Sequence, residues 1–246
     1  MTRNNQWLTT GIVLAAALLG GIRAGAADAS LSVDIASAYV FRGATFNDGL
    51  VLQPGLELGG FSIPEGAGSV NVGVWANLDI DDYDGMLADG QFSEIDMYAT
   101  YEFPFEAANV SVGYTEYTYP SGGGDADREV SLNASLDVPL APSLAVFYGL
   151  DGGVESTLYI EAGIGHELKL SEALSLSLGA ALGYLDPDEG EAGLSHYSLS
   201  AGAAFGVFNA AVTWVAQADD QVLPDVADGG GYDVDLYGTI GVALEF

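Results

Sequence analysis

The sequence predicts an antiparallel transmembrane β-barrel of about 12 strands, preceded by a signal peptide, with both ends of the barrel on the periplasmic side. Twelve segments of roughly ten residues alternate between apolar and polar side chains. After the first 27 residues, no apolar run is long enough for a membrane helix, so only a closed barrel could cross a bilayer. The chain also ends on an aromatic residue, Phe246, in phase with the apolar face of its last segment.

The charge balance excludes several classes of protein. The 246 residues include 5 Lys and Arg against 35 Asp and Glu, a formal net charge of −30. Such a polyanion repels nucleic acid, so no nucleic-acid partner is expected. An apolar content of 49% is too high for a disordered chain, and the absence of Cys excludes disulfides and thiolate metal sites.

The N-terminal segment has the three parts of a signal peptide. Arg3 opens it, residues 11–22 are apolar, and small residues precede Asp28. The apolar part is too short for a comfortable transmembrane helix, which is the alternative. We therefore predict a signal peptide over 1–27 and an outer-membrane β-barrel over 28–246.

The strands follow from the period-two pattern. In the last segment, the alternate residues from Tyr232 and Val234 through Leu236 to Phe246 form an apolar face, and polar or small residues form the other. An even number of strands puts both ends of the chain on one side of the membrane. The short connections alternate with longer acidic ones, which is the pattern of outer-membrane barrels. The predicted strands are 31–42, 50–60, 69–80, 93–103, 109–119, 128–138, 143–150, 157–168, 174–184, 195–205, 207–217 and 232–246.

A water-soluble β-sandwich or barrel would show the same periodicity, with its apolar face turned inward. Two features favour the membrane barrel. Small residues gather on the polar face, as expected where space inside a ring is tight, and aromatic residues gather at the ends of the apolar faces, as in interfacial girdles. The aromatic residues are Tyr39, Phe41, Phe61, Phe103, Tyr148, Tyr184, Tyr197, Phe205, Phe208, Trp214, Tyr232 and Phe246.

The predicted lumen is narrow and acidic. Twelve tilted strands give a backbone cylinder about 24 Å across, and the inward side chains reduce the diameter of the lumen further. Carboxylates that line a narrow pore favour cations, although these groups could equally be solvated or share protons without any role in transport. The candidate lumen residues are Asp34, Glu57, Glu94, Asp96, Glu129, Glu161, Asp233 and Asp235, with Arg42 facing them.

Arg42 is one of only three basic residues after position 27. The alternation turns it inward from the top of the first predicted strand, towards the acidic wall. A guanidinium there can bind carboxylates through two parallel hydrogen bonds. Arg42 is thus either a latch at a constriction or a structural ion pair between strands. Whether a loop plugs the lumen stays open.

Catalytic and metal sites are weakly supported. Ser195 and His196 are adjacent, so a regular strand would turn them to opposite faces. The acidic loop that starts at Asp79 lacks ligands at both ends of the calcium-loop pattern, at Ile80 and Gln91. We expect no catalytic residue, no cofactor and no specific metal site, although the acidic loops could bind divalent cations loosely.

The segment from Ser37 to Thr45, SAYVFRGAT, resembles the start of a family of proteobacterial outer-membrane β-barrel proteins, the TorF-type porins or Gcw_chp family. The loop at Asn47 and the strand start at Pro54 agree with that pattern. The resemblance implies a small porin-like barrel and supplies no substrate. The final Phe246 resembles the signal that the barrel assembly machinery reads.

These observations together predict a porin-like channel of the outer membrane. It would pass ions and small hydrophilic solutes passively, prefer cations and not be an enzyme. The alternative is a plugged structural or adhesive barrel that acts through its acidic extracellular loops. The expected partners are the lipid bilayer and lipopolysaccharide, the barrel assembly machinery, and small cations or solutes. A monomer is expected rather than a trimer.

Overall fold

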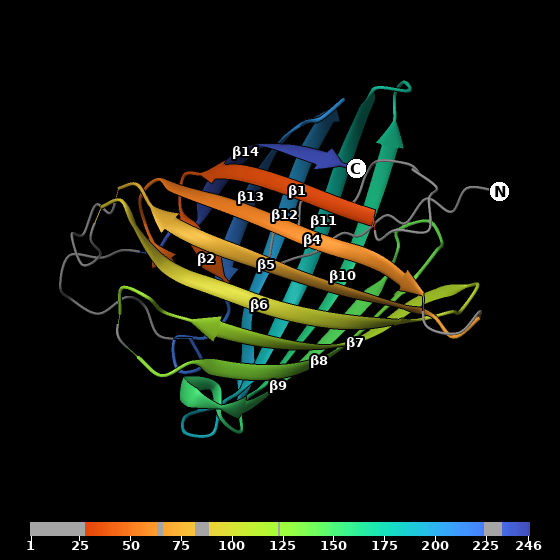
Figure 1. Ribbon diagram of the computed structural model, residues 1–246. Coiled ribbons are helices and arrows are strands. Elements are labelled where there is room, and N and C mark those ends of the chain that lie inside the picture. The colour runs from red at the N-terminus through yellow and green to blue at the C-terminus, as the bar shows by residue number, and fades with distance from the viewer. Residues whose placement is uncertain (1–27, 63–65, 82–88, 123, 224–232) are drawn as a thin grey trace.

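Twelve strands close into a single antiparallel barrel in the computed structural model (Figure 1). The structure describes residues 28–62, 66–81, 89–122, 124–223 and 233–246, so the predicted signal peptide lies outside the described residues. No described helix is long and apolar enough to cross a membrane. The barrel strands are β1 (Asp28–Ala36), β4 (Val51–Ser62), β5 (Ser69–Asp79), β6 (Gln91–Phe103), β7 (Ala108–Thr118), β8 (Asp127–Leu136), β9 (Ser143–Asp151), β10 (Leu158–Lys169), β11 (Leu174–Asp186), β12 (Gly193–Phe205), β13 (Phe208–Gln217) and β14 (Leu236–Glu245).

The first and last barrel strands close the ring. β1 pairs antiparallel with β14 on one side and with β4 on the other. Ala29 and Phe246 exchange backbone hydrogen bonds, so the barrel begins and ends at the same place. We call this the terminal end, and the opposite rim the loop end. The predicted closed barrel with an even number of strands is confirmed.

The connections differ at the two ends. Those at the terminal end are short; β12 and β13, for example, are separated only by residues 206–207. At the loop end, the connections include residues 80–90, 187–192 and 218–235. The connection between β9 and β10 holds a short 3-10 helix, η1 (Gly152–Val154). The alternation of short and longer connections follows the predicted pattern.

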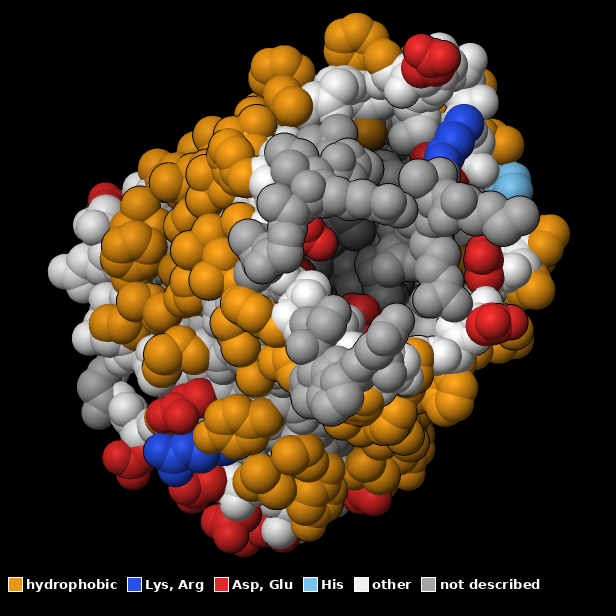
Figure 2. Space-filling model, turned by 45° about the vertical axis from the view of Figure 1, so that its right-hand side comes forward, with side chains coloured by type: hydrophobic (Ala, Val, Ile, Leu, Met, Phe, Trp, Pro, Cys, Tyr) orange, Lys and Arg blue, Asp and Glu red, His pale blue; other side chains and the backbone are white. Residues whose placement is uncertain are grey.

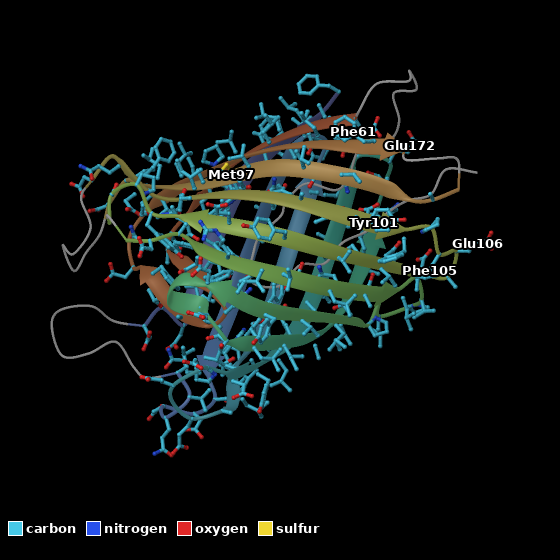
Figure 3. The ribbon with its side chains drawn as sticks, turned by 60° about the horizontal axis from the view of Figure 1, so that its bottom comes forward. Phe61, Met97, Tyr101, Phe105, Glu106 and Glu172 are labelled. Carbon is cyan, nitrogen blue, oxygen red and sulfur yellow. The ribbon has the colours of Figure 1, made fainter. Side chains whose placement is uncertain are left out.

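The outer face of the barrel is apolar along most strands, as the orange surface in Figure 2 shows. Aromatic side chains gather near its ends. Figure 3 shows Phe61, Tyr101 and Phe105 near the terminal end, with Met97 farther along β6. The rings of Tyr101 and Phe103 lie 4.9 Å apart between centroids. An apolar band with aromatic borders suits a surface that faces lipid.

The first predicted strand is wrong beyond residue 36. β1 ends at Ala36, and the chain then folds into a separate hairpin of β2 (Tyr39–Phe41) and β3 (Ala44–Asn47). The pairing with β14 continues for one residue beyond β1, since the backbone N–H of Ser37 donates to the Gly238 carbonyl, and the chain leaves the wall after it. Tyr39 is buried and Phe41 half-buried, so neither belongs to the lipid-facing girdle.

The last strand is also shorter than predicted. β14 starts at Leu236, not at residue 232. Val234, which the alternation assigned to the outer face, is buried against Ala38, Val40 and Val215. The segment before β14 packs on the hairpin rather than continuing the wall, because the Val234 side chain contacts Ala38 and Val40 there. The predicted girdle residue Tyr232 lies outside the described residues.

Candidate functional site

The lumen wall carries the predicted carboxylates. Side chains alternate across each strand, so the polar positions of the wall point inward while their apolar neighbours point out. Six predicted lumen residues lie on the inward faces of their strands and are buried or half-buried: Asp34 on β1, Glu57 on β4, Glu94 and Asp96 on β6, Glu129 on β8 and Glu161 on β10. Asp233 and Asp235 precede β14, in the connection from β13, and so do not lie on the inward face of a strand.

The β2–β3 hairpin crosses the inside of the barrel, where Figure 1 shows β2 within the outline of the wall. The hairpin turns at Arg42 and Gly43, whose φ angles are +52° and +87°. Two positive φ angles in succession are typical of the tightest hairpin turns. A side chain at Gly43 would also meet His196, since its Cβ would lie 2.6 Å from that residue's Cβ. Glycine therefore allows the tip to approach the wall.

Contacts on both sides hold the hairpin across the lumen. On one side, Tyr39 packs with Ala36 and Val51, and its ring centroid lies 5.5 Å from that of Trp75. On the other side, Ala38 and Val40 belong to the cluster with Val215 and Val234 described above. The hairpin thus buries apolar side chains inside an otherwise polar lumen.

Polar contacts also fasten the hairpin. Tyr39 Oη donates to Glu94 Oε2 at 2.9 Å, and Asn47 Nδ2 donates to Asp79 Oδ1 at the same distance. The backbone N–H of Val234 donates to Thr45 Oγ1 at 2.9 Å. These bonds join the hairpin to β5, β6 and the segment before β14, so it is tied to the wall on both sides of β1 and β4.

Arg42 reaches the far wall. Its two terminal nitrogens donate to the two carboxylate oxygens of Glu129, each at 2.8 Å. Its guanidinium carbon lies 4.6 Å from the ring centroid of Phe41, 4.3 Å from that of Phe147 and 4.5 Å from that of Tyr159. Phe147 is on β9, six places from β1 in the ring of twelve, so the hairpin spans the lumen. The predicted inward position of Arg42 is correct, although it comes from the hairpin and not from a strand of the wall.

The electrostatics of the Arg42 contact favour a permanent ion pair. Burial alone lowers the pKa of Arg42, but the hydrogen bonds and charge of Glu129 raise it above the ordinary value. The Glu129 side chain is 2% exposed, so its carboxylate is almost fully removed from water. A buried charge needs a partner of opposite sign, and each member of this pair supplies one for the other.

A second polar region lies nearer the terminal end. Tyr98 Oη donates to Glu57 Oε2 at 3.0 Å. Asn71 Nδ2 and Ser69 Oγ donate to the Glu102 carboxylate at 3.1 and 3.3 Å. Figure 2 shows the barrel hollowed at this end, with acidic side chains visible inside. This part of the lumen therefore combines open space with negative charge.

The prediction that Ser195 and His196 point to opposite faces of their strand is wrong. Both are buried, and Ser195 Oγ lies 3.1 Å from His196 Nδ1. The pairing of β11 with β12 shifts at Gly183, which leaves Ser195 as an extra residue in β12. Such a bulge turns two successive side chains to the same side. Glu161 Oε2 lies 4.0 Å from His196 Nε2, beyond hydrogen-bonding distance.

The described residues contain no group of three or more acidic, His or Cys side chains arranged to hold a metal ion. The residues that the sequence-based reasoning missed are aromatic. Phe147 and Tyr159 face the lumen at the tip of the hairpin, yet their strands alternate like the others. The sequence did carry a signal for Tyr159. It stands two residues before the inward Glu161, and residues two apart in a strand share a face, so Tyr159 also points into the lumen.

The chain matches one protein-family model and is similar in fold to a solved outer-membrane channel. The model of a bacterial family, described as "Bacterial protein of unknown function (Gcw_chp)", matches residues 23–231. Among curated proteins, no relative is detected. The COG4313 outer membrane channel from Pseudomonas putida F1 superposes with a TM-score of 0.50 at 10% identity, covering 92% of this chain and 97% of that one. The KdgM porin, solved with disordered oligogalacturonate, has a TM-score of 0.43 at 8% identity over 89% and 98% of the two chains.

Proposed function

Since the chain belongs to the Gcw_chp family and folds as an outer-membrane β-barrel, we propose that it is a porin-like channel for passive diffusion of ions and small hydrophilic solutes. The observation that carries this proposal is the closed barrel with a polar interior and an apolar outer face. A ring without free edges, apolar towards lipid and polar inside, provides an aqueous path through a bilayer. The terminal end would face the periplasm.

The channel would prefer cations. The wall residues that face the lumen include several carboxylates, and the basic residue placed among them, Arg42, is already paired with Glu129. Fixed negative charge in a narrow pore raises the local concentration of cations and repels anions. Near the hollowed terminal end, Glu57 and Glu102 are the residues that would act most directly on passing ions.

The chain would do no chemistry. Ser195 is the one candidate nucleophile with a histidine beside it among the described residues, but it is 1% exposed and lies under the tip of the hairpin. A nucleophile has to reach its substrate, and the carboxylate that would orient the histidine is out of hydrogen-bond reach.

We also propose lipopolysaccharide and bilayer lipid as partners of the outer face, and Phe246 as the signal for the barrel assembly machinery.

Solute diffusion is tested by liposome swelling. Refolded barrels in multilamellar vesicles should let small sugars enter, so the turbidity of the vesicles should fall quickly in an isotonic sugar solution. The rate should decrease as the sugar becomes larger, because a narrow lumen filters by size. Swelling no faster than that of protein-free vesicles for every sugar would oppose the proposal, provided that the barrel is folded.

Cation preference is tested by charge removal near the terminal end. The double variant Glu57→Gln/Glu102→Gln should shift the reversal potential towards zero by on the order of 10 mV in a salt gradient, and more at low ionic strength. Glu106→Gln/Glu172→Gln is the matched control, because Figure 3 shows both side chains on turns at the rim. An equal shift in the two double variants would contradict a role for the lumen carboxylates.

A further inference from the structure

The tip of the hairpin occupies a place on the wall that is built to hold a planar cation. The wall supplies the Glu129 carboxylate and the faces of Phe147 and Tyr159, and these residues come from three adjacent strands. Aromatic faces attract a cation within about 6 Å of the ring centroid. Both rings contact Arg42 well within that limit, at 4.3 and 4.5 Å. A carboxylate that accepts two parallel hydrogen bonds matches the fork of a guanidinium.

This arrangement is also held in place by residues other than Arg42. Tyr117 Oη donates to Glu129 Oε2 at 2.8 Å, which fixes the carboxylate from the β7 side. Tyr159 Oη donates to Glu161 Oε2 at 2.7 Å, and the Tyr159 ring packs 6.0 Å from that of Phe147. The wall part of the site is therefore preorganised, which reduces the ordering that a ligand must drive.

We propose that Glu129, Phe147 and Tyr159, together with Tyr117, form a lumen binding site for solutes that carry a guanidinium group. Arg42 fills this site in the present structure as an internal ligand. A solute with the same group would compete with Arg42 and displace the tip of the hairpin. The site lies inside the proposed channel, but its binding can be measured on the folded barrel whether or not the barrel conducts.

The empty site would attract a cation strongly. Without Arg42, the buried Glu129 carboxylate would have no positive partner from the hairpin, and an uncompensated buried charge is strongly unfavourable. An ammonium ion could restore the charge balance, but it lacks the planar fork and stacks less well on rings. The site should therefore prefer guanidinium to ammonium and both to sodium.

Arg42→Asn empties the site with little damage to the hairpin. Asparagine followed by Gly43 is the dipeptide most favoured in tight hairpin turns with two positive φ angles. Calorimetry on the refolded variant should detect guanidinium chloride at millimolar concentration, with an affinity at least about tenfold higher than for ammonium chloride. The unaltered chain should show no binding at these concentrations, because Arg42 occupies the site.

Two further variants separate the site from general charge effects. Arg42→Asn/Glu129→Gln should lose guanidinium binding by about tenfold or more, since the carboxylate is gone. Arg128→Asn is the control for loss of an arginine, because Arg128 lies on the outer face with Glu116 and Asp151 and should create no site. Folding of each variant is checked by its heat-dependent mobility in gels.

The proposal would be overturned if Arg42→Asn bound guanidinium no better than the unaltered chain, or if the Glu129→Gln change left that binding intact. Should Arg42→Asn fail to fold, Arg42→Gly takes its place, because glycine accepts the positive φ at this position. Conductance is then a separate readout: a barrel that binds guanidinium without conducting would reject the channel proposal and support this site.

Discussion

Shortening the lumen hairpin should raise the single-channel conductance of the barrel at least about twofold, because the conductance of a narrow aqueous pore grows with its open cross-section. The variant replaces residues 38–48 with two glycines. β1 and β4 are neighbours paired through Ala36 and Val51, so the shortened connection still joins them directly. Current through single refolded channels in a planar bilayer gives the measurement.

The control for this variant shortens another connection at the same rim. Deleting residues 188–190, between β11 and β12, leaves the hairpin and its contacts intact. That control should conduct like the unaltered chain. Equal conductance in the hairpin variant and the unaltered chain would mean that the hairpin does not limit the pore, despite the contacts that it makes across the lumen.

Glu129→Ala should destabilise the folded barrel by about 3–5 kcal/mol, the usual loss when one member of a buried ion pair is removed. The guanidinium of Arg42 would keep its aromatic neighbours but lose both hydrogen bonds to the carboxylate. Tyr117 would also lose the acceptor for its hydroxyl. Urea unfolding in lipid vesicles, followed by intrinsic fluorescence, measures the change in the free energy of unfolding.

Glu116→Ala is the matched comparison, because Glu116 pairs with Arg128 at 3.5 Å on the outside of the barrel, where both side chains are about a third exposed. Partly exposed pairs contribute little, so this change should lower the free energy of unfolding much less than Glu129→Ala does. Similar losses in the two variants would contradict the view that the Arg42–Glu129 pair anchors the hairpin.

The wall of the barrel could be predicted from sequence because every wall strand separates the same two environments. Lipid on one side and the lumen on the other impose a period of two on each strand, and the short connections reveal where the strands end. The inward orientation of carboxylates such as Asp96 and Glu129 could be predicted directly from this alternation. The family resemblance also pointed correctly to the Gcw_chp family.

The hairpin could not be predicted in this way. Tyr39 and Phe41 alternate with their neighbours as they would in a lipid-facing strand, and periodicity does not distinguish an apolar face towards lipid from one packed inside a barrel. The first position of such a turn is usually Asn, Asp or Gly, but here it is Arg42. Gly43 was therefore the only residue that indicated a turn. Val234 was misassigned for the same reason, since its partners are on the hairpin.

The bulge at Ser195 could not be predicted from the alternation of side chains either. One extra residue in a strand changes which neighbours share a face, and no residue in the sequence marks the position of this one. Gly183, on the opposing strand, makes room for it, because a Cβ there would lie 2.6 Å from Ser195 Oγ. That requirement becomes visible only once the two strands are paired.

The proposal that this barrel is an open, cation-preferring channel is tested most directly by the conductance of the unaltered chain. The refolded barrel is inserted into a planar bilayer, and single-channel currents are recorded across a potassium chloride gradient. A cation-preferring channel should give discrete, stable conductance steps and a reversal potential of the sign expected for cations. A correctly folded barrel that shows no conductance steps at any voltage, or one that selects anions, would contradict it.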